Sequence, residues 1–193
     1  MGRNKRLSDK KQIIDASFHI MDTEGVEALT MRRISTELGV SAMTPYNYVR
    51  DTKDIRREIL IRSFNSIYQS TYAQMSSMLE EEGCTGLVAY AKAYAYTLYD
   101  FASEHCGVCS YLIGEGNRSF HNDVELGPFY DPFDIFLSEL ELGEKDREFR
   151  AVLRAYECMV LSLIHEYTAG LYELSKENYK YMIELFIKRM FIF

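Results

Sequence analysis

The residues best suited to contacting another molecule lie in a short polar segment near the N-terminus. Ser41, Met43 and Thr44 have side chains small or narrow enough to approach the edges of DNA bases, so we assign sequence specificity to them. Tyr46, Asn47 and Tyr48 follow at once and carry groups that can donate hydrogen bonds to phosphate. A plain helical hairpin with the tyrosines in its core is the alternative interpretation.

Two short helices must position these residues. Thr30 is a good N-cap for a first helix that Gly39 ends, and Ser41 can cap a second one reaching about Val49. The glycine allows the two helices to meet at a steep angle. The second helix of such a pair enters the major groove of DNA, while the first crosses the backbone. Pro45 removes one early hydrogen bond, so we expect an irregular start of the second helix.

Longer helices flank this pair. One runs from a cap at Ser8 to just before Gly25, and another, capped by Asp51, runs from about Thr52 to Leu79.

Charge is divided unevenly along the 193 residues. Residues 1–62 hold 12 Lys and Arg against nine Asp and Glu, a net charge of +3, while residues 63–193 carry −10. A basic N-terminal segment followed by an acidic remainder is typical of a chain that binds phosphate at one end. Lys5 and Arg6 are the candidate contacts. A solvated basic tail is the alternative.

The runs Ala28–Ser41 and Thr44–Val49, together with the helix before them, resemble the DNA-binding domain of TetR-type bacterial regulators. The match covers roughly residues 8–60. The resemblance implies a homodimeric regulator, usually a repressor, that a small molecule releases from operator DNA. It also implies a helix-turn-helix domain over residues 1–51 and an effector-binding and dimerisation domain over residues 52–193.

Two positions depart from the family pattern. Pro45 stands where the family usually has leucine, and Thr52 stands at the family's phosphate-gripping lysine, with Lys53 one step later. Pattern and resemblance together predict these DNA contacts: Lys5, Arg6, Thr30, Arg33, Ser41, Met43, Thr44, Tyr46, Asn47, Tyr48 and Lys53.

The rest of the chain predicts an all-α fold, with a C-terminal helical bundle. Residues 86–105 are apolar nearly all round, which favours a helix surrounded by protein. Residues 114–132 are rich in Gly and Pro and predict a loop, and helical spacing returns from Phe149 to Tyr167. Ser175 can cap the last helix.

Two sites are expected in this C-terminal part. The first is a pocket for an unidentified small molecule, cationic or neutral, lined by Tyr90, Tyr94, Leu98, Tyr156 and Glu157. The second is a homodimer interface through Tyr179, Ile183, Phe186, Ile187 and Met190, a face wider than one packing partner needs. Core packing is the alternative for each tyrosine.

Other chemistry is not favoured. His105, Cys106 and Cys109 could sense a metal or a redox change, with Cys84 or His121 as a further ligand, but a single Cys-x-x-Cys is more often incidental. We find no enzyme motif and expect no catalytic residue, metal or cofactor. A helical enzyme or carrier with a purely structural hairpin is the alternative function. With neither a signal peptide nor an apolar stretch of membrane-spanning length, we expect a cytoplasmic protein.

Overall fold

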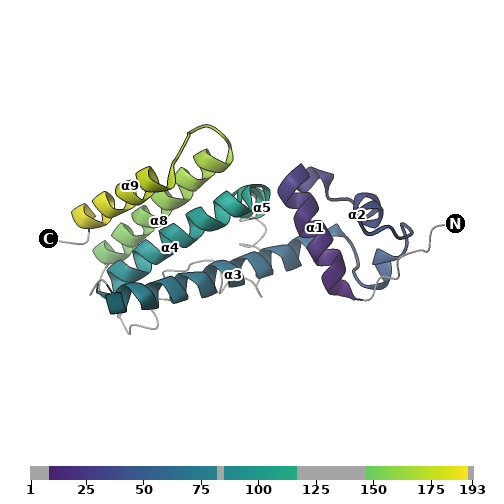
Figure 1. The fold of residues 1–193 in the computed structure, drawn as a ribbon, viewed down its shortest axis with the longest axis horizontal. Coiled ribbons are helices and arrows are strands. Elements are labelled where there is room, and N and C mark those ends of the chain that lie inside the picture. Colours follow the sequence, from purple (N-terminus) through teal and green to yellow (C-terminus); the bar gives the residue numbers. More distant parts are fainter. Residues whose placement is uncertain (1–8, 82–84, 117–146, 191–193) are drawn as a thin grey trace.

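The computed structural model describes residues 9–81, 85–116 and 147–190, and Figure 1 shows their arrangement. Every regular element in these residues is a helix, as the sequence predicts. A small N-terminal group of helices forms one end of an elongated molecule, and a bundle of longer helices forms the other (Figure 1). None of the described helices combines the length and the apolar character needed to cross a membrane.

The N-terminal helices are set by local capping. Helix α1 spans Lys10–Glu24, and Asp9 rather than Ser8 caps it, its carboxylate accepting from the Gln12 amide at 3.0 Å. Helix α2 spans Met31–Leu38; Thr30 caps it through the Arg33 amide at 3.1 Å, and Gly39 ends it with a φ of 67°. Both of these predicted ends of α2 are confirmed.

Helix α3, Thr52–Glu81, connects the two ends of the molecule. The Asp51 carboxylate caps it, accepting from the amides of Lys53 at 2.8 Å and Asp54 at 3.0 Å. Helix α4, Gly86–Glu104, then returns along α3 toward the N-terminal group, where the short helix α5, Cys106–Tyr111, and a π-helical turn, η3, Leu112–Gly116, follow it (Figure 1).

Two C-terminal helices cover α4 on the side away from α3. They are α8, Arg147–Thr168, and α9, Lys176–Met190, whose predicted cap Ser175 accepts from the Asn178 amide at 3.2 Å. Helix α4 is therefore enclosed, as its apolar composition predicts. Tyr156 of α8 and Tyr179 of α9 donate hydrogen bonds to the α4 carbonyls of Ala91, at 2.8 Å, and Ala95, at 3.0 Å.

This packing corrects the predicted dimer face. Tyr179, Ile183 and Ile187 are buried within their own chain, while Phe186 and Met190 are half-buried at the edge of the same face. Three of the five predicted interface residues therefore fill the space above α4 in their own chain, and Phe186 and Met190 remain partly open to a partner. The outer face of α9 presents Tyr181, 67% exposed, and Leu185, 43% exposed.

Candidate nucleic-acid interface

The predicted recognition helix is a turn followed by the short 3-10 helix η2, Pro45–Asn47. A regular helix starting at Ser41 would need a hydrogen bond from the nitrogen at position 45 to the Ser41 carbonyl, and proline has no N–H to donate. The Thr44 amide donates to that carbonyl instead, at 3.0 Å, and the buried ring of Pro45 anchors the turn. The prediction of a helix to Val49 is thus wrong, while the expected irregular start is confirmed.

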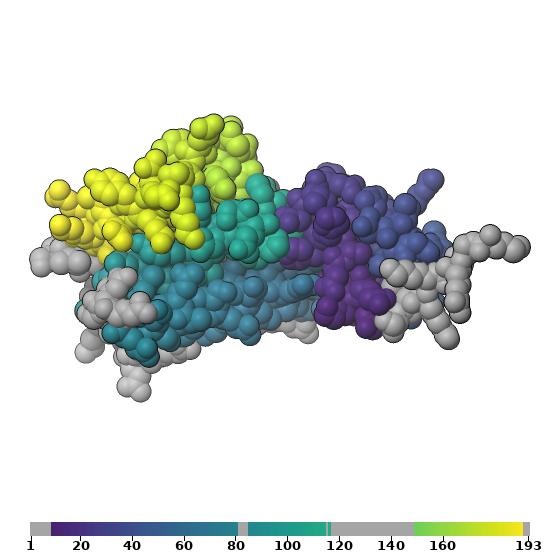
Figure 2. Space-filling view, viewed as in Figure 1, coloured from purple at the N-terminus to yellow at the C-terminus, as the bar shows by residue number. Residues whose placement is uncertain are grey.

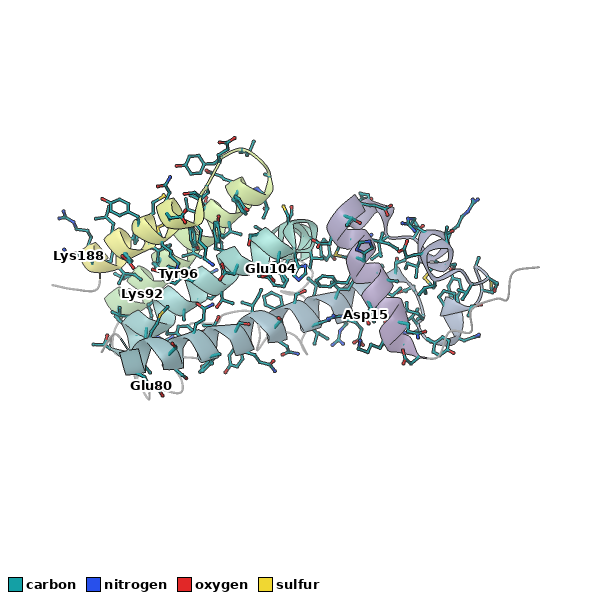
Figure 3. The ribbon with its side chains drawn as sticks, viewed as in Figure 1. Asp15, Glu80, Lys92, Tyr96, Glu104 and Lys188 are labelled. Atoms are coloured by element: carbon teal, nitrogen blue, oxygen red, sulfur yellow. The ribbon has the colours of Figure 1, made fainter. Side chains whose placement is uncertain are left out.

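Side chains on this turn point outward at the end of the molecule remote from the bundle. Met43 is 71% exposed, and Tyr46, Asn47 and Tyr48 are also exposed. The hydroxyls of Ser41 and Thr44 are hydrogen-bonded to each other at 2.8 Å. In the space-filling view, the N-terminal group of helices that contains this segment lies at the end of the molecule opposite α9 (Figure 2).

Arg33, one of the predicted DNA contacts, makes ion pairs within the chain. Its guanidinium donates to both oxygens of Glu24, with Nη2 at 2.6 Å from Oε1, and to Glu37 at 2.8 Å. The hydrogen bond to Glu24 is the main reason that the pKa of Arg33 is raised. Arg33 therefore fastens the end of α1 to α2, and its charge is already matched by two carboxylates.

Basic groups surround the start of α3. Lys53 is exposed there, and Arg50, which sequence reasoning missed, is exposed while donating to the Asp54 carboxylate at 2.5 and 2.8 Å. These hydrogen bonds from Arg50 lower the pKa of Asp54 to about 2. Exposed pairs of this kind are weak enough for a phosphate to compete for the arginine. Lys5 and Arg6 lie outside the described residues.

A second feature missed from the sequence joins the two ends of the molecule. The Asp22 carboxylate of α1 accepts from the first amides of α5, Gly107 at 3.0 Å and Val108 at 3.3 Å, and lies 3.2 Å from Nδ1 of His105. A Cβ at Gly107 would lie 2.4 Å from the Asp22 carbonyl oxygen. The absence of a side chain at position 107 therefore permits this close approach of backbones, which we call the Asp22 junction.

All five residues predicted to line an effector pocket are buried: Tyr90, Tyr94, Leu98, Tyr156 and Glu157. They lie on α4 and α8, which pack together, and Glu157 pairs with the half-exposed Arg154. Burial, with Glu157 as the next cause, raises the pKa of Tyr94 well above its ordinary value. A carboxylate among phenol rings is an environment suited to a cationic or hydrogen-bonding guest.

Thr97 of α4 adds a further polar atom to this part of the core. Its side chain is buried, and its Oγ1 has no hydrogen-bond partner in the part of the chain that the structure describes. A buried hydroxyl without a partner costs free energy, so such an atom is a candidate for contact with a ligand. Sequence patterns contain no signal for this, because threonine usually bonds to its own helix.

The cysteines give little support to thiol or metal sensing. Burial raises the pKa of Cys106 and raises that of Cys109 to about 12, so both thiols are protonated at neutral pH. Among the described residues, no three His, Cys, Asp or Glu side chains gather as metal ligands would.

Comparisons with known proteins agree with this geometry. The chain is 29% identical over 98 residues to YobS, an uncharacterized HTH-type transcriptional regulator of Bacillus subtilis, covering 51% of this chain but only 48% of that protein. It is 26% identical over 125 residues to an HTH-type transcriptional regulator of Staphylococcus aureus, covering 51% of this chain and 68% of that protein. No family model matches the chain.

A solved structure extends the likeness across the whole fold. The crystal structure of the multidrug binding protein EbrR, complexed with imidazole, matches with a TM-score of 0.60 at 13% sequence identity, covering 94% of this chain and 96% of that one.

Relatives and architecture point to one class: over about half of its length, the chain is similar to helix-turn-helix transcriptional regulators, and it spans about half the length of the first of them. Within that class its fold is of the TetR type, as the resemblance in the N-terminal sequence predicts.

Proposed function

We propose that the protein is a homodimeric repressor that binds operator DNA through residues 1–51 and releases it when a small molecule enters residues 52–193. The observation that carries this proposal is the exposed recognition turn at the free end of the molecule, with Met43, Tyr46 and Tyr48 presented outward. A purely structural hairpin would bury these side chains instead.

The test of DNA binding is a mobility shift of the full-length protein on the DNA upstream of its own gene. We expect a specific shift that cell extract reverses, if the extract holds the effector. Binding should weaken steeply with salt, because each phosphate contact adds about 0.9 to the log–log slope. Replacing Lys5 and Arg6 by alanine should flatten the slope. The matched control is Lys11→Ala, since Lys11 already pairs with Asp15 at 2.7 Å.

For the effector, we propose a small organic cation or a neutral hydrogen-bonding molecule held between α3, α4 and α8. Support comes from the buried Glu157 and Tyr94, from the Thr97 hydroxyl, which has no partner among the described residues, and from the fold shared with a protein described as multidrug binding. Titration of the protein–DNA complex with aromatic cations tests this. Glu157→Gln should lower the affinity for a cation and leave DNA binding unchanged. Glu166→Gln, an exposed change on the same helix, should leave both unchanged.

For release, we propose that the effector acts on two connections between the ends of the molecule, helix α3 and the Asp22 junction. A ligand that displaces α4 would move α5, which is tied to α1 through the carboxylate of Asp22. Asp22→Asn should therefore change the effector concentration needed for release. It should leave operator affinity without effector nearly unaltered, which a gel titration measures directly.

For dimerisation, we propose the outer faces of α8 and α9 in place of the buried face. On α8 the exposed residues Ala151, Ala155, Cys158 and Ser162 recur at helical spacing and allow a second helix to approach closely, while α9 supplies Tyr181 and Leu185. The double change Tyr181→Glu with Leu185→Glu should yield a folded monomer in sedimentation. Leu79→Glu, an exposed apolar position on α3, is the matched control and should leave a dimer.

A further inference from the structure

We propose that Met43 is the principal base-reading residue of the protein and that it recognises the 5-methyl group of thymine. This inference rests on the proposed function, since it concerns how the DNA would be read. It narrows the set Ser41, Met43 and Thr44, among which the sequence makes no choice.

The position of Met43 supports a role in base reading more strongly than its exposure does. Single exposed apolar side chains are common on protein surfaces. Met43, however, is the third residue of the four-residue turn that the Thr44 amide closes onto the Ser41 carbonyl at 3.0 Å. This turn directly follows α2, in the place where helix-turn-helix proteins meet the base edges of the major groove. At 71% exposure, its side chain is the most exposed large hydrophobic one of the N-terminal group of helices.

The neighbouring hydroxyls are less free to read bases. Ser41 and Thr44 are hydrogen-bonded to each other at 2.8 Å, across the turn whose tip carries Met43. The mutual bond uses the hydrogen of one hydroxyl, so donation from that group to a base would compete with it, and we assign the pair mainly to holding the turn. Ala42, also exposed, has too short a side chain to reach as far as methionine.

The chemistry of the methionine side chain selects the feature of DNA that it can recognise. It offers no N–H or O–H donor, and its sulfur is a weak acceptor. In the major groove, the one apolar group of the four bases is the C5 methyl of thymine. A long, unbranched and polarisable side chain adapts readily to such a small apolar target. Met43 is therefore suited to thymine and poorly suited to the polar edges of the other bases.

The experiment replaces single thymines by deoxyuridine, which lacks only the methyl group. Duplexes bound by the full-length protein are first selected from a randomised library, and each thymine of the best duplex is then exchanged in turn. We expect one thymine per half-site at which the exchange weakens binding about fourfold, the value for one buried methyl group. In Met43→Gln, which keeps the length of the side chain but not its apolar end, this loss should vanish. In Met43→Leu it should persist.

The control is Tyr46→Phe, a change at a predicted phosphate contact, which should weaken binding to thymine and deoxyuridine duplexes alike. Equal binding of every deoxyuridine duplex by the unaltered protein would overturn the inference, and so would an undiminished loss in Met43→Gln. Either result would leave the proposed DNA binding intact. A library that yields no enriched duplex would instead overturn both the proposed function and the inference that rests on it.

Discussion

The two ends of the molecule use polar side chains in opposite ways. In the N-terminal helices, hydroxyls and carboxylates lie at the surface and cap helices or pair with nearby charges, as Thr30 and Asp54 do. In the bundle, tyrosine hydroxyls are buried and donate across helices, with Tyr99 reaching the Leu174 carbonyl at 2.7 Å and Tyr179 reaching Ala95. The first arrangement leaves a surface ready for a charged partner, and the second fixes how helices lie on one another.

The largest expected effect separates the inner face of α9 from the exposed surface. Ile183→Ala removes a fully buried side chain and should lower the free energy of unfolding by about 2–5 kcal/mol. Leu171→Ala, at a leucine that precedes α9 and is 75% exposed, should change it by less than about 0.5 kcal/mol. Chemical denaturation at a fixed protein concentration measures both. Equal losses would mean that Ile183 is not buried in the folded protein.

The next effect tests the contact between the two ends. In Gly107→Ala the new methyl group would meet the Asp22 carbonyl at 2.4 Å, so the backbone must move. We expect a loss of stability of about 1–3 kcal/mol, as for other overpacked sites. Gly86→Ala, where no atom of the described residues lies within 4 Å of the added carbon, is the matched control and should be neutral or slightly stabilising. A stable Gly107→Ala protein would show that α1 and α5 are not in close contact in solution.

A smaller effect concerns local capping at the DNA-binding end. Thr30→Ala should cost about 1 kcal/mol, because the Arg33 amide loses its acceptor. Thr36→Ala, an exposed change inside the same helix, should cost much less, since that hydroxyl donates to a carbonyl of its own helix, that of Arg32. Thermal unfolding of the two variants makes the comparison. A reversed order would argue that α2 begins elsewhere.

The smallest effect is a pH dependence at Asp54. Arg50 lowers the pKa of this carboxyl to about 2 in the folded chain, below its ordinary value of 3.8. Its contribution to stability is therefore present above pH 4 and declines as the pH falls toward 2. In Asp54→Asn the melting temperature should vary less over that interval. If the melting temperatures of the unaltered protein and of the variant fall equally between pH 4 and pH 2, the pair with Arg50 does not persist in solution.

Features that depend on neighbouring residues could be predicted from the sequence, whereas contacts between helices could not. The caps Thr30, Asp51 and Ser175 depend on neighbours within three residues, so their sequence patterns suffice to predict them. The sequence does not predict that Tyr179, Ile183 and Ile187 pack within their own chain, because apolar spacing shows that a face is buried but not which chain covers it.

Contacts between residues that are distant in sequence are the part of the structure that sequence patterns did not predict. The carboxylate of Asp22 meets the Gly107 amide across 85 positions of sequence, and Arg33 meets Glu24 only because α1 and α2 pack together. Periodicity and capping rules describe separations of a few residues, so neither pairing has a local signal.

The buried tyrosines of the bundle also have an optical consequence. The chain has 15 tyrosines and no tryptophan, so its near-ultraviolet absorbance reports mainly on phenol groups. Burial is the main cause of the raised pKa of Tyr94, Tyr156 and Tyr179, whereas Tyr46, Tyr48 and Tyr181 are exposed. An alkaline titration should show that these buried rings form phenolate late, only as the bundle opens. The absorbance of the tyrosines therefore reports whether the bundle is folded, and no attached dye is needed.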